Sequence, residues 1–365
     1  MINRTTTAPA RQARIAVLVL ASIASTACQP PAAAPPAPPS APPPATSAGP
    51  TLGLRTFEAV DPITKAALPI AVVYPAAGAA DPASATTVIG PYTVAAGRGL
   101  EVAAGRWPLV VISHGHGGSP WGHHDLAEAL ARAGTVVAMV EHIGDSWRDQ
   151  SAFRSDRVMY GRAYQVSATI DRVLAEPALA AQIDPDRIGV AGFSAGGYTS
   201  LLMVGAEPDF TRVPAYCQRH TDDAEICGGS LRVELTAVQR TPTRDPRVRA
   251  AFAMAPFAVA FGPAQLRAIT APVFLAWATA DQKLLPAENA AAIAPALPTL
   301  AGRRVIEGAG HFVFLAPCSS ALATDAAELC TDPPGIDRAA IHTQLAADAV
   351  QFFARALAVR SAPPR

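Results

Sequence analysis

VAGFSAGG, residues 190–197, places Ser194 between Gly192 and Gly196 in a G-x-S-x-G pattern. The pattern alone is weak evidence, because glycine, serine and alanine are common in this chain. Its context is more informative: an apolar run over residues 187–193 precedes the serine, and the residues after it predict a helix over about 195–205. A buried strand that turns sharply into a helix is the setting of a nucleophile elbow, where a serine adopts a strained backbone conformation between small neighbours.

Apolar runs on either side of this stretch alternate with helical patterns. Strands are expected at residues 68–76, 108–115, 135–142, 187–194, 248–256, 271–280 and about 303–307, and helices at about 123–134, 164–176, 195–205 and 336–359. Because these strands are apolar throughout and alternate with helices, they predict a mostly parallel, doubly wound sheet with helices on both faces, in the α/β class. The alternation breaks over about residues 207–247, which indicates a cap-like insertion over the strand ends.

The composition supports one large core and argues against a polyanionic partner. The 365-residue chain is 50% hydrophobic and 16% charged, with 29 basic and 29 acidic residues. A formal net charge of zero provides no long-range field that would favour nucleic acid over other ligands. No nucleic-acid partner is therefore expected.

The N-terminal region reads as an export signal followed by a spacer. Residues 1–28 combine a basic start, a short apolar run and small residues before Cys28, and the apolar run is too short to span a bilayer. Cys28 resembles the lipidated cysteine of bacterial lipoproteins; the alternative is simple cleavage after Ala27. The proline- and alanine-rich residues 29–50 predict an extended linker, with the folded domain over 51–360. We expect an exported protein that is periplasmic, anchored to the outer membrane through Cys28, or secreted.

Four further cysteines favour disulfide bonds over a metal site. Cys217 lies close in sequence to Cys227, and Cys318 lies close to Cys330. An even number of cysteines is expected in an oxidising compartment, although four cysteines allow three connectivities and local pairing is only the preferred one. Neither pair has C-x-x-C spacing or a nearby histidine cluster, so no metal is expected there. The adjacent His123 and His124 are interpreted as a solvated helix start.

Two more polar residues follow predicted strands, in the order of a Ser-Asp-His triad. Asp281 comes directly after the strand at 271–280, and His311 lies in EGAGHF after the last strand. The carboxyl ends of parallel strands meet at one edge of a sheet, so Ser194, Asp281 and His311 are expected to converge there. In this arrangement the serine attacks a carbonyl, the histidine transfers its proton and the aspartate orients the imidazole. Glu141 and Asp145, after the strand at 135–142, are rival acids.

The segment SHGHGG, residues 113–118, is expected to complete the site. Its glycines Gly115 and Gly117 let the backbone approach a substrate closely. The backbone N–H groups of His116 and Ala195 are candidate donors of an oxyanion hole. Two tryptophans, Trp121 and Trp147, are candidates for shaping the pocket, with core packing an equal alternative for each.

Four segments together resemble the α/β-hydrolase superfamily, and within it the predicted dienelactone-hydrolase-like group related to platelet-activating factor acetylhydrolases. They are PLVVISHGHGGSPWGHHDLAEALARAG, GVAGFSAGGYTSLLMVG, VFLAWATADQKLLP and EGAGHF. The resemblance implies a cofactor-independent esterase for short or modest acyl groups, with Ser194, Asp281 and His311 as its triad. True dienelactone hydrolases use a cysteine nucleophile, so the group's name does not define the substrate here.

These expectations amount to an exported serine hydrolase that cleaves a small-molecule carboxylic ester. A lipase, phospholipase or polyester hydrolase is the alternative within the enzyme class. The alternative from another class is a non-catalytic envelope lipoprotein that uses the scaffold for binding, because fold does not determine function.

Overall fold

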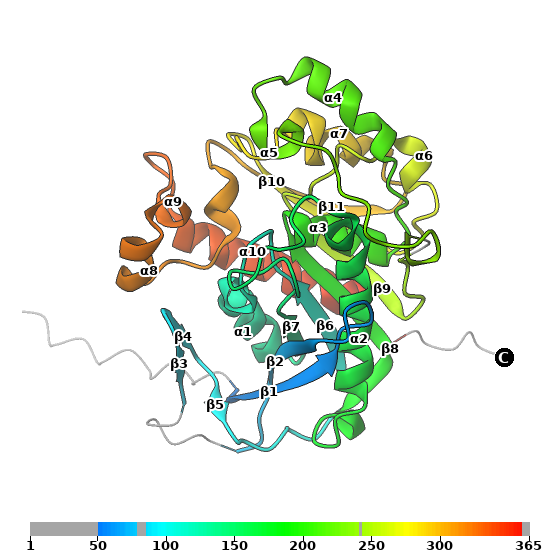
Figure 1. The fold of residues 1–365 in the computed structure, drawn as a ribbon. Coiled ribbons are helices and arrows are strands. Elements are labelled where there is room, and N and C mark those ends of the chain that lie inside the picture. Colours follow the sequence, from blue (N-terminus) through cyan, green and yellow to red (C-terminus); the bar gives the residue numbers. More distant parts are fainter. Residues whose placement is uncertain (1–49, 79–84, 241–242, 360–365) are drawn as a thin grey trace, which may run out of the picture. The chain divides into compact units, whose positions relative to one another are not determined.

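A computed structural model describes residues 50–78, 85–240 and 243–359. Its centre is a nine-stranded sheet with the strand order β11-β10-β9-β8-β6-β7-β2-β1-β5 (Figure 1). The strands are β1 Leu52–Val60, β2 Ala67–Pro75, β5 Gly97–Arg98, β6 Trp107–Ser113, β7 Val136–Val140, β8 Ile183–Phe193, β9 Val248–Met254, β10 Val273–Ala278 and β11 Leu300–Ile306. A separate hairpin pairs β3 Thr87–Ile89 with β4 Tyr92–Val94. The predicted export signal with Cys28, and nearly all of the predicted linker, lie outside the described residues.

The sheet is parallel from β7 through β6, β8, β9 and β10 to β11, as expected from the apolar runs. Its N-terminal part differs from the expectation. The predicted strand at 68–76 is β2, which pairs antiparallel with both β1 and β7. The sequence analysis did not identify β1, because its polar and apolar residues alternate and it lacks a continuous apolar run. A tight turn closes the β1–β2 hairpin, with Lys65 at φ 64°.

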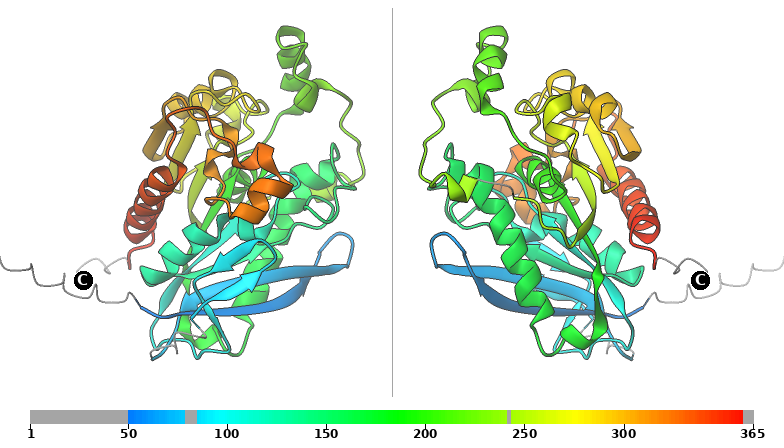
Figure 2. Two further views of the ribbon diagram at one scale, coloured as in Figure 1. Left: turned by 90° about the vertical axis from the view of Figure 1, so that its left-hand side faces the viewer. Right: turned by 90° about the vertical axis from the view of Figure 1, so that its right-hand side faces the viewer.

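The longer helices are α1 His124–Arg132, α2 Arg162–Leu174, α3 Ala195–Met203 and α10 Arg338–Ala356. Two apolar cores show that they cover both faces of the sheet. On one face, α2 and α3 pack against alternate residues of the central strands, such as Val111 and Val190. On the other face, α1 and α10 pack against residues such as Val110 and Phe252. Figure 2 shows the sheet between these two layers. The doubly wound α/β class is therefore confirmed.

Shorter helices belong to the connections. They are α4 Val213–Arg219, α5 Ala224–Cys227, α6 Pro263–Leu266, α7 Ala290–Ile293, α8 Ser320–Asp325 and α9 Ala327–Cys330. The helices α4 and α5 lie within residues 207–240, which we call the cap, and the cap carries one disulfide bond, between Cys217 and Cys227. The helices α8 and α9 form a second excursion from the sheet, residues 316–336, which follows His311 in the chain and carries the disulfide bond between Cys318 and Cys330 (Figure 1).

Candidate active site

Ser194 lies at a sharp turn between β8 and α3. Its backbone has φ 55° and ψ −116°, a left-handed conformation that a side chain other than glycine rarely adopts. The flanking glycines are required by space. A Cβ atom at Gly196 would lie 1.9 Å from the carbonyl oxygen of Ser113, and one at Gly192 would lie 2.1 Å from the carbonyl oxygen of Gly196. The G-x-S-x-G pattern therefore forms the strand-turn-helix elbow that its context predicted.

The structure brings Ser194, Asp281 and His311 together in one chain of hydrogen bonds. His311 Nε2 lies 3.0 Å from Ser194 Oγ, and His311 Nδ1 lies 2.6 Å from Asp281 Oδ2. Asp281 and His311 are both buried. With the proton on Nδ1, the imidazole donates to the carboxylate, and its Nε2 accepts the serine hydroxyl. This is the relationship between nucleophile, base and orienting acid that general-base activation of a hydroxyl requires.

Backbone donors fix Asp281 after β10. Its Oδ1 accepts the N–H groups of Lys283 at 2.9 Å and Leu284 at 2.8 Å, which leaves Oδ2 for His311. The rival acids have other partners. Glu141 pairs with Arg148 at 3.2 Å, and Asp145 forms an ion pair with Arg162 at 2.5 Å. Asp281 is therefore the acid that contacts the imidazole of His311.

The loop after β6 lies directly against the elbow. A Cβ atom at Gly115 would lie 3.4 Å from Ser194 Cβ, so this glycine permits the close approach. The backbone N–H groups of His116 and Ala195 make no hydrogen bond within the described parts of the chain, whereas Tyr198 N–H already donates to the carbonyl oxygen of Ser194 at 3.0 Å. Both His116 and Ala195 line the same cavity as Ser194. Two unpaired backbone donors near Ser194 fit the expected oxyanion hole.

A buried polar network supports this loop from below. Arg162 of α2 donates from Nη1 to Asp145 Oδ2 at 2.5 Å and from Nη2 to the carbonyl oxygen of His114. Asp145 Oδ1 accepts His116 Nδ1. Burial alone would raise the pKa of Asp145, but Arg162 and His116 outweigh it and lower that pKa. The aspartate is thus ionised, and it connects α2 to the side chain of His116.

Two further histidines in the network are neutral. Ser113 Oγ lies 2.8 Å from His142 Nε2, and His142 Nδ1 lies 2.8 Å from Gln165 Oε1. Burial, assisted by the charge of Arg162, lowers the pKa of His114 to about 3 and lowers that of His142 well below its usual value. The segment SHGHGG contains three members of this network, but no sequence motif identified the others, because they come from the loop between β7 and α2 and from α2 itself.

Comparison with known proteins places this geometry in context. Residues 121–297 match the prolyl oligopeptidase family, Peptidase_S9. Among curated proteins, "Putative esterase NocK" of Nocardia uniformis subsp. tsuyamanensis is 31% identical over 112 residues, which are 28% of this chain and 30% of that protein. The chain thus spans less than a third of the length of that relative.

Two solved structures align with most of this chain. The ferulic acid esterase of Streptomyces cinnamoneus aligns over 89% of this chain and 94% of its own, with TM-score 0.57 and 23% identity. A dienelactone hydrolase of Anabaena variabilis aligns over 83% of this chain and 99% of its own, with TM-score 0.47 and 17% identity. The first of these, with the parallel sheet and the elbow after β8, decides the fold. The chain has the α/β-hydrolase fold.

A cavity of about 420 Å³ opens above Ser194 in this α/β-hydrolase fold. Its floor includes Ala195 and Tyr198 of α3, and its walls come from the loop before α2 and from the cap. Aromatic and aliphatic side chains dominate the lining, among them Phe153, Phe210 and Phe257. Both Cys217 and Cys227 also line it, so the cap disulfide forms part of the wall. The cap, residues 207–240, therefore lies on the side of the sheet where β8 ends at the elbow.

None of the four candidates for the pocket, Gly115, Gly117, Trp121 and Trp147, is among the residues that line the cavity. Trp147 is 57% exposed and its ring stacks with Arg148, whose Cζ lies 4.5 Å from the ring centre, because its loop turns outward after β7. Trp121 packs against the core beside α1 instead of lining the cavity. Gly117 has φ 59° and faces the side chain of Gln150. The tryptophans could not be placed from sequence, because their positions depend on how two loops leave the sheet.

The histidines at the start of α1 also differ from the expectation. His123 is 1% exposed and lies against the ring of Phe193, and burial lowers its pKa to about 4. His124 pairs with Glu128 at 2.9 Å. The expected solvated helix start is wrong for His123, because α10 and the segment after His311 cover it. Within residues 50–78, 85–240 and 243–359, no group of three or more His, Cys, Asp or Glu side chains is arranged to hold a metal ion.

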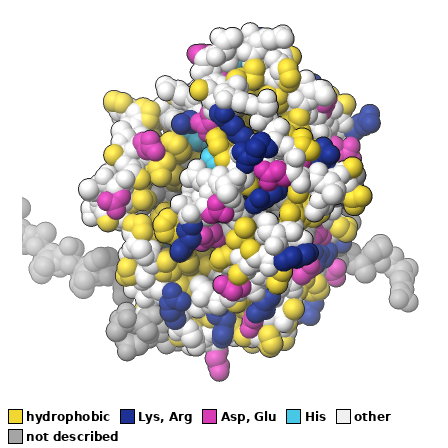
Figure 3. Space-filling view, in the orientation of Figure 1, with side chains coloured by type: hydrophobic (Ala, Val, Ile, Leu, Met, Phe, Trp, Pro, Cys, Tyr) yellow, Lys and Arg dark blue, Asp and Glu magenta, His cyan; other side chains and the backbone are white. Residues whose placement is uncertain are grey.

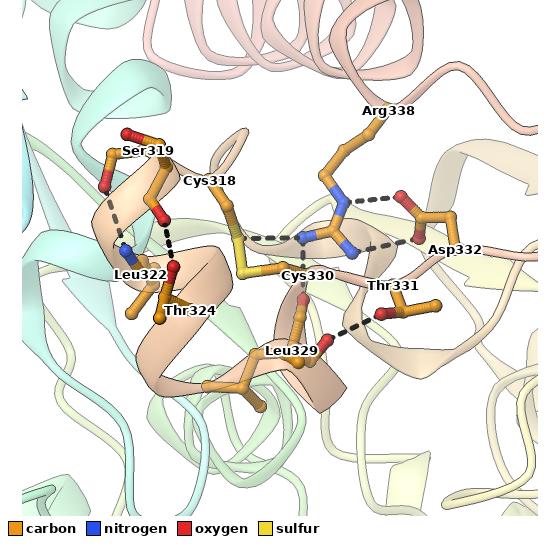
Figure 4. The surroundings of a disulfide bond; sticks show 11 residues. Cys318, Ser319, Leu322, Thr324, Leu329, Cys330, Thr331, Asp332 and Arg338 are labelled. Atoms are coloured by element: carbon orange, nitrogen blue, oxygen red, sulfur yellow. Dashed lines mark hydrogen bonds and ion pairs between the residues drawn. A yellow bond between two sulfur atoms is a disulfide. The ribbon is translucent and has the colours of Figure 1, made fainter.

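The second disulfide bond stabilises the excursion that follows His311. Cys318 pairs with Cys330, and Arg338 at the start of α10 lies against both ends of the excursion (Figure 4). The Arg338 guanidinium donates to Asp332 at 2.8 and 2.9 Å and to the carbonyl oxygen of Leu329 at 2.8 Å. Both local pairings expected from sequence are thus present. Since neither Cys318 nor Cys330 lines the cavity, this disulfide is structural.

Proposed function

We propose that this protein is a serine hydrolase that cleaves carboxylic esters through an acyl-enzyme intermediate. The observation that carries the proposal is the hydrogen-bonded chain from Ser194 Oγ through His311 to Asp281, at 3.0 and 2.6 Å. It begins at a strained serine beside a cavity, and nothing in the packing of the sheet requires these three side chains to meet. A scaffold used only for binding would have no physical reason to retain this strained conformation, so catalysis accounts for the site better.

The geometry assigns each residue a step. Ser194 Oγ attacks the carbonyl carbon of the ester while its proton passes to His311 Nε2. The oxygen that gains negative charge accepts the N–H groups of Ala195 and His116. The proton on His311 then passes to the leaving alkoxide, and the alcohol departs. Water attacks the acyl-enzyme by the same route and releases the acid. Asp281 stabilises the imidazolium formed in both halves.

The cavity supports a small-molecule ester as the substrate. A largely apolar space of about 420 Å³ accommodates a short or medium acyl chain and an alcohol of modest size. The cap forms part of its wall, which places an upper limit on the group that fits while the cap keeps this position. The names of the relatives agree with ester chemistry, since one is called an esterase and another a ferulic acid esterase.

The test combines turnover with active-site labelling. Purified protein is expected to hydrolyse p-nitrophenyl esters from acetate to octanoate, and a fluorophosphonate probe should label Ser194 and no other serine. Ser194→Ala should abolish both without changing the circular dichroism spectrum. The absence of turnover and labelling in a folded protein would favour a binding role. Faster cleavage of peptide p-nitroanilides than of esters would favour the chemistry of the prolyl oligopeptidase family.

We further propose that the enzyme acts outside the cytoplasm and is anchored to a membrane by a lipid on Cys28. The linker at 29–50 separates the folded domain from this anchor. The two disulfide bonds support an oxidising compartment. Among the helices that the structure describes, none is both long and apolar enough to cross a bilayer. Membrane fractionation of cells making the wild type and Cys28→Ser tests the anchor. The variant is expected in the soluble fraction, and a wild type that is also soluble would contradict lipidation.

A further inference from the structure

An arginine without a counter-charge lies in the wall of the cavity above Ser194. Arg154 donates from Nη2 to the carbonyl oxygens of Ala224 at 2.5 Å and Glu225 at 3.4 Å, both in α5. Its Nε is buried and has no hydrogen-bond partner. Among the described residues, Nη1 also has no partner and no carboxylate lies at ion-pair distance from the guanidinium. Nη1 is therefore the donor atom that remains available to a ligand, since Nη2 is engaged by α5 and Nε is buried.

The acidic side chain nearest in this wall is already neutralised. Glu225 lines the cavity, but its carboxylate pairs with Lys283 at 3.1 Å. Most other lining residues are apolar, including Phe153, whose ring centre lies 5.2 Å from Arg154 Cζ. Figure 3 shows Lys and Arg side chains gathered below α4 on this face of the molecule. A positive charge in largely apolar surroundings is unfavourable unless a partner supplies the opposite charge.

The local backbone is built to hold the guanidinium in this place. Arg154 has φ 55°, a left-handed conformation that is unfavourable for arginine, and its carbonyl oxygen accepts the N–H of Arg232 at 2.7 Å. The cap makes room for it with two glycines. A Cβ at Gly228 would lie 2.7 Å from Arg154 Nη2, and one at Gly229 would lie 2.8 Å from Nη1. A strained arginine that packs against two glycines, in the wall of the cavity that Ser194 also lines, fits a ligand-binding role.

We propose that Arg154 recognises a carboxylate on the substrate, so that the preferred ester is a half-ester of a dicarboxylic acid with an apolar spacer. The inference rests on the proposed function, because Ser194 must cleave the ester. The N–H groups on Nη1 of Arg154 donate charge-assisted hydrogen bonds to the carboxylate, and the aromatic and aliphatic walls contact the spacer. Arg154 is thus a specificity-determining residue that touches the part of the substrate remote from the reacting carbonyl.

Two esters of equal length test the preference in the wild-type protein. They are p-nitrophenyl hydrogen suberate, which carries a carboxylate, and p-nitrophenyl methyl suberate, in which a methyl ester replaces it. We expect kcat/KM to be at least 10-fold higher for the charged ester, and added NaCl to reduce that ratio. Monomethyl suberate should inhibit more strongly than dimethyl suberate. Equal or higher kcat/KM for the uncharged ester would overturn the inference.

Variants of Arg154 and Arg232 distinguish recognition of the substrate carboxylate from structural support of the cap. Arg154→Met is expected to lower the charged-to-uncharged ratio of kcat/KM by about 10- to 100-fold and to change the uncharged ester less than 3-fold. Arg154→Lys should retain part of the preference. The matched control is Arg232→Met, since Arg232 also anchors the cap, through the Ser151 carbonyl oxygen at 2.8 Å, without lining the cavity. It should leave the ratio unchanged.

Each failure has a distinct meaning. A protein that cleaves neither ester contradicts the proposed function itself. A protein that cleaves both esters without preferring the charged one retains the proposed function and overturns only the role of Arg154. If Arg154→Met loses both activities equally, as a purely structural residue would, the role of Arg154 in recognition is also overturned. If this variant does not fold, the ratio and the inhibition measured on the wild type still decide the question.

Discussion

Arg162 and Asp145 form a buried ion pair beneath the loop that contacts Ser194, with 2.5 Å between Nη1 and Oδ2. The same guanidinium donates to the carbonyl oxygen of His114, two residues before a candidate oxyanion donor. Helix α2, which precedes β8 in the chain, therefore sets the position of the loop at which the oxyanion is expected to form. Arg162 is a positioning residue in this arrangement.

Replacing Arg162 with methionine is expected to reduce both stability and kcat. The change leaves Asp145 buried without its main counter-charge, which typically costs about 3–5 kcal/mol of unfolding free energy. Because the loop loses its support, kcat should fall by roughly 10- to 100-fold with little change in KM, since the oxyanion donors act mainly on the transition state. Urea unfolding and steady-state kinetics check this. The control is Arg106→Met, which removes an exposed ion pair with Asp184 at 3.6 Å. It should lower the unfolding free energy by less than about 1 kcal/mol.

Replacing Asp281 with asparagine should abolish most of the activity without unfolding the protein. The amide oxygen can still accept the N–H groups of Lys283 and Leu284, but the amide no longer stabilises the imidazolium of His311. A loss of about 10⁴-fold in kcat is expected, the size found for such a change in other triads. Glu141→Gln, at the rival acid, should change kcat less than about 3-fold. Equal losses in the two variants would contradict the assignment of Asp281.

Lowering the pH should reduce the unfolding free energy already at pH values above those at which carboxylates become protonated. Burial holds the pKa of His114 near 3, that of His123 near 4 and that of His142 well below its usual value. In the unfolded chain these histidines titrate near pH 6.5. Above that pH both states are neutral and the histidines do not affect stability. As pH falls below 6.5, only the unfolded state gains protons, so each histidine lowers the unfolding free energy by about 1.4 kcal/mol per pH unit.

Urea unfolding at pH 7.0, 6.0 and 5.0 measures this effect, and His123→Gln is the variant to compare. It removes one of the three titrations, so the decline between pH 6.0 and 5.0 should shrink by about a third. Unfolding free energies that stay constant over this range would show that the three histidines are protonated in the folded state or accessible to water.

The two disulfide bonds should differ in their effect on activity. The two bonds join cysteines 10 and 12 residues apart. Removing either bond should lower the unfolding free energy by roughly 2–3 kcal/mol. The pair Cys217→Ser and Cys227→Ser should also change KM and the acyl-length preference, because both sulfurs line the cavity. The pair Cys318→Ser and Cys330→Ser should lower the melting temperature alone. Identical kinetic effects in the two double variants would contradict a role of the cap disulfide in the cavity wall.

The sequence predicted the residues that meet at strand ends, and the reason is geometric. Ser194, Asp281 and His311 each follow a strand of the parallel sheet, and such strands deliver their carboxyl-terminal residues to one edge. The elbow could be predicted because its glycines are required by local space. The antiparallel hairpin of β1 and β2 was harder to predict, because alternation of polar and apolar residues gives a weaker signal than a continuous apolar run.

Residues that depend on contacts between distant elements could not be predicted. No motif marked Arg162, which lies just before the helix predicted over 164–176, and Asp145 was a rival for the catalytic acid until the structure placed the two together. Arg154 carries no motif, and its position in the cavity wall depends on how the cap folds back. Residue type made Trp147 a candidate for the pocket or for the core, but its side chain is exposed, because the direction of its loop is set by tertiary packing.

Among the described residues, main-chain amides alone hold the remaining oxygen of Asp281. Every residue except proline supplies this donor, so substitutions at 283 and 284 are expected to leave the carboxylate oriented. The side chains of these two residues have other contacts, since Lys283 pairs with Glu225 and Leu284 lines the cavity. In evolution, these two positions can therefore alter the cap and the cavity without moving the acid.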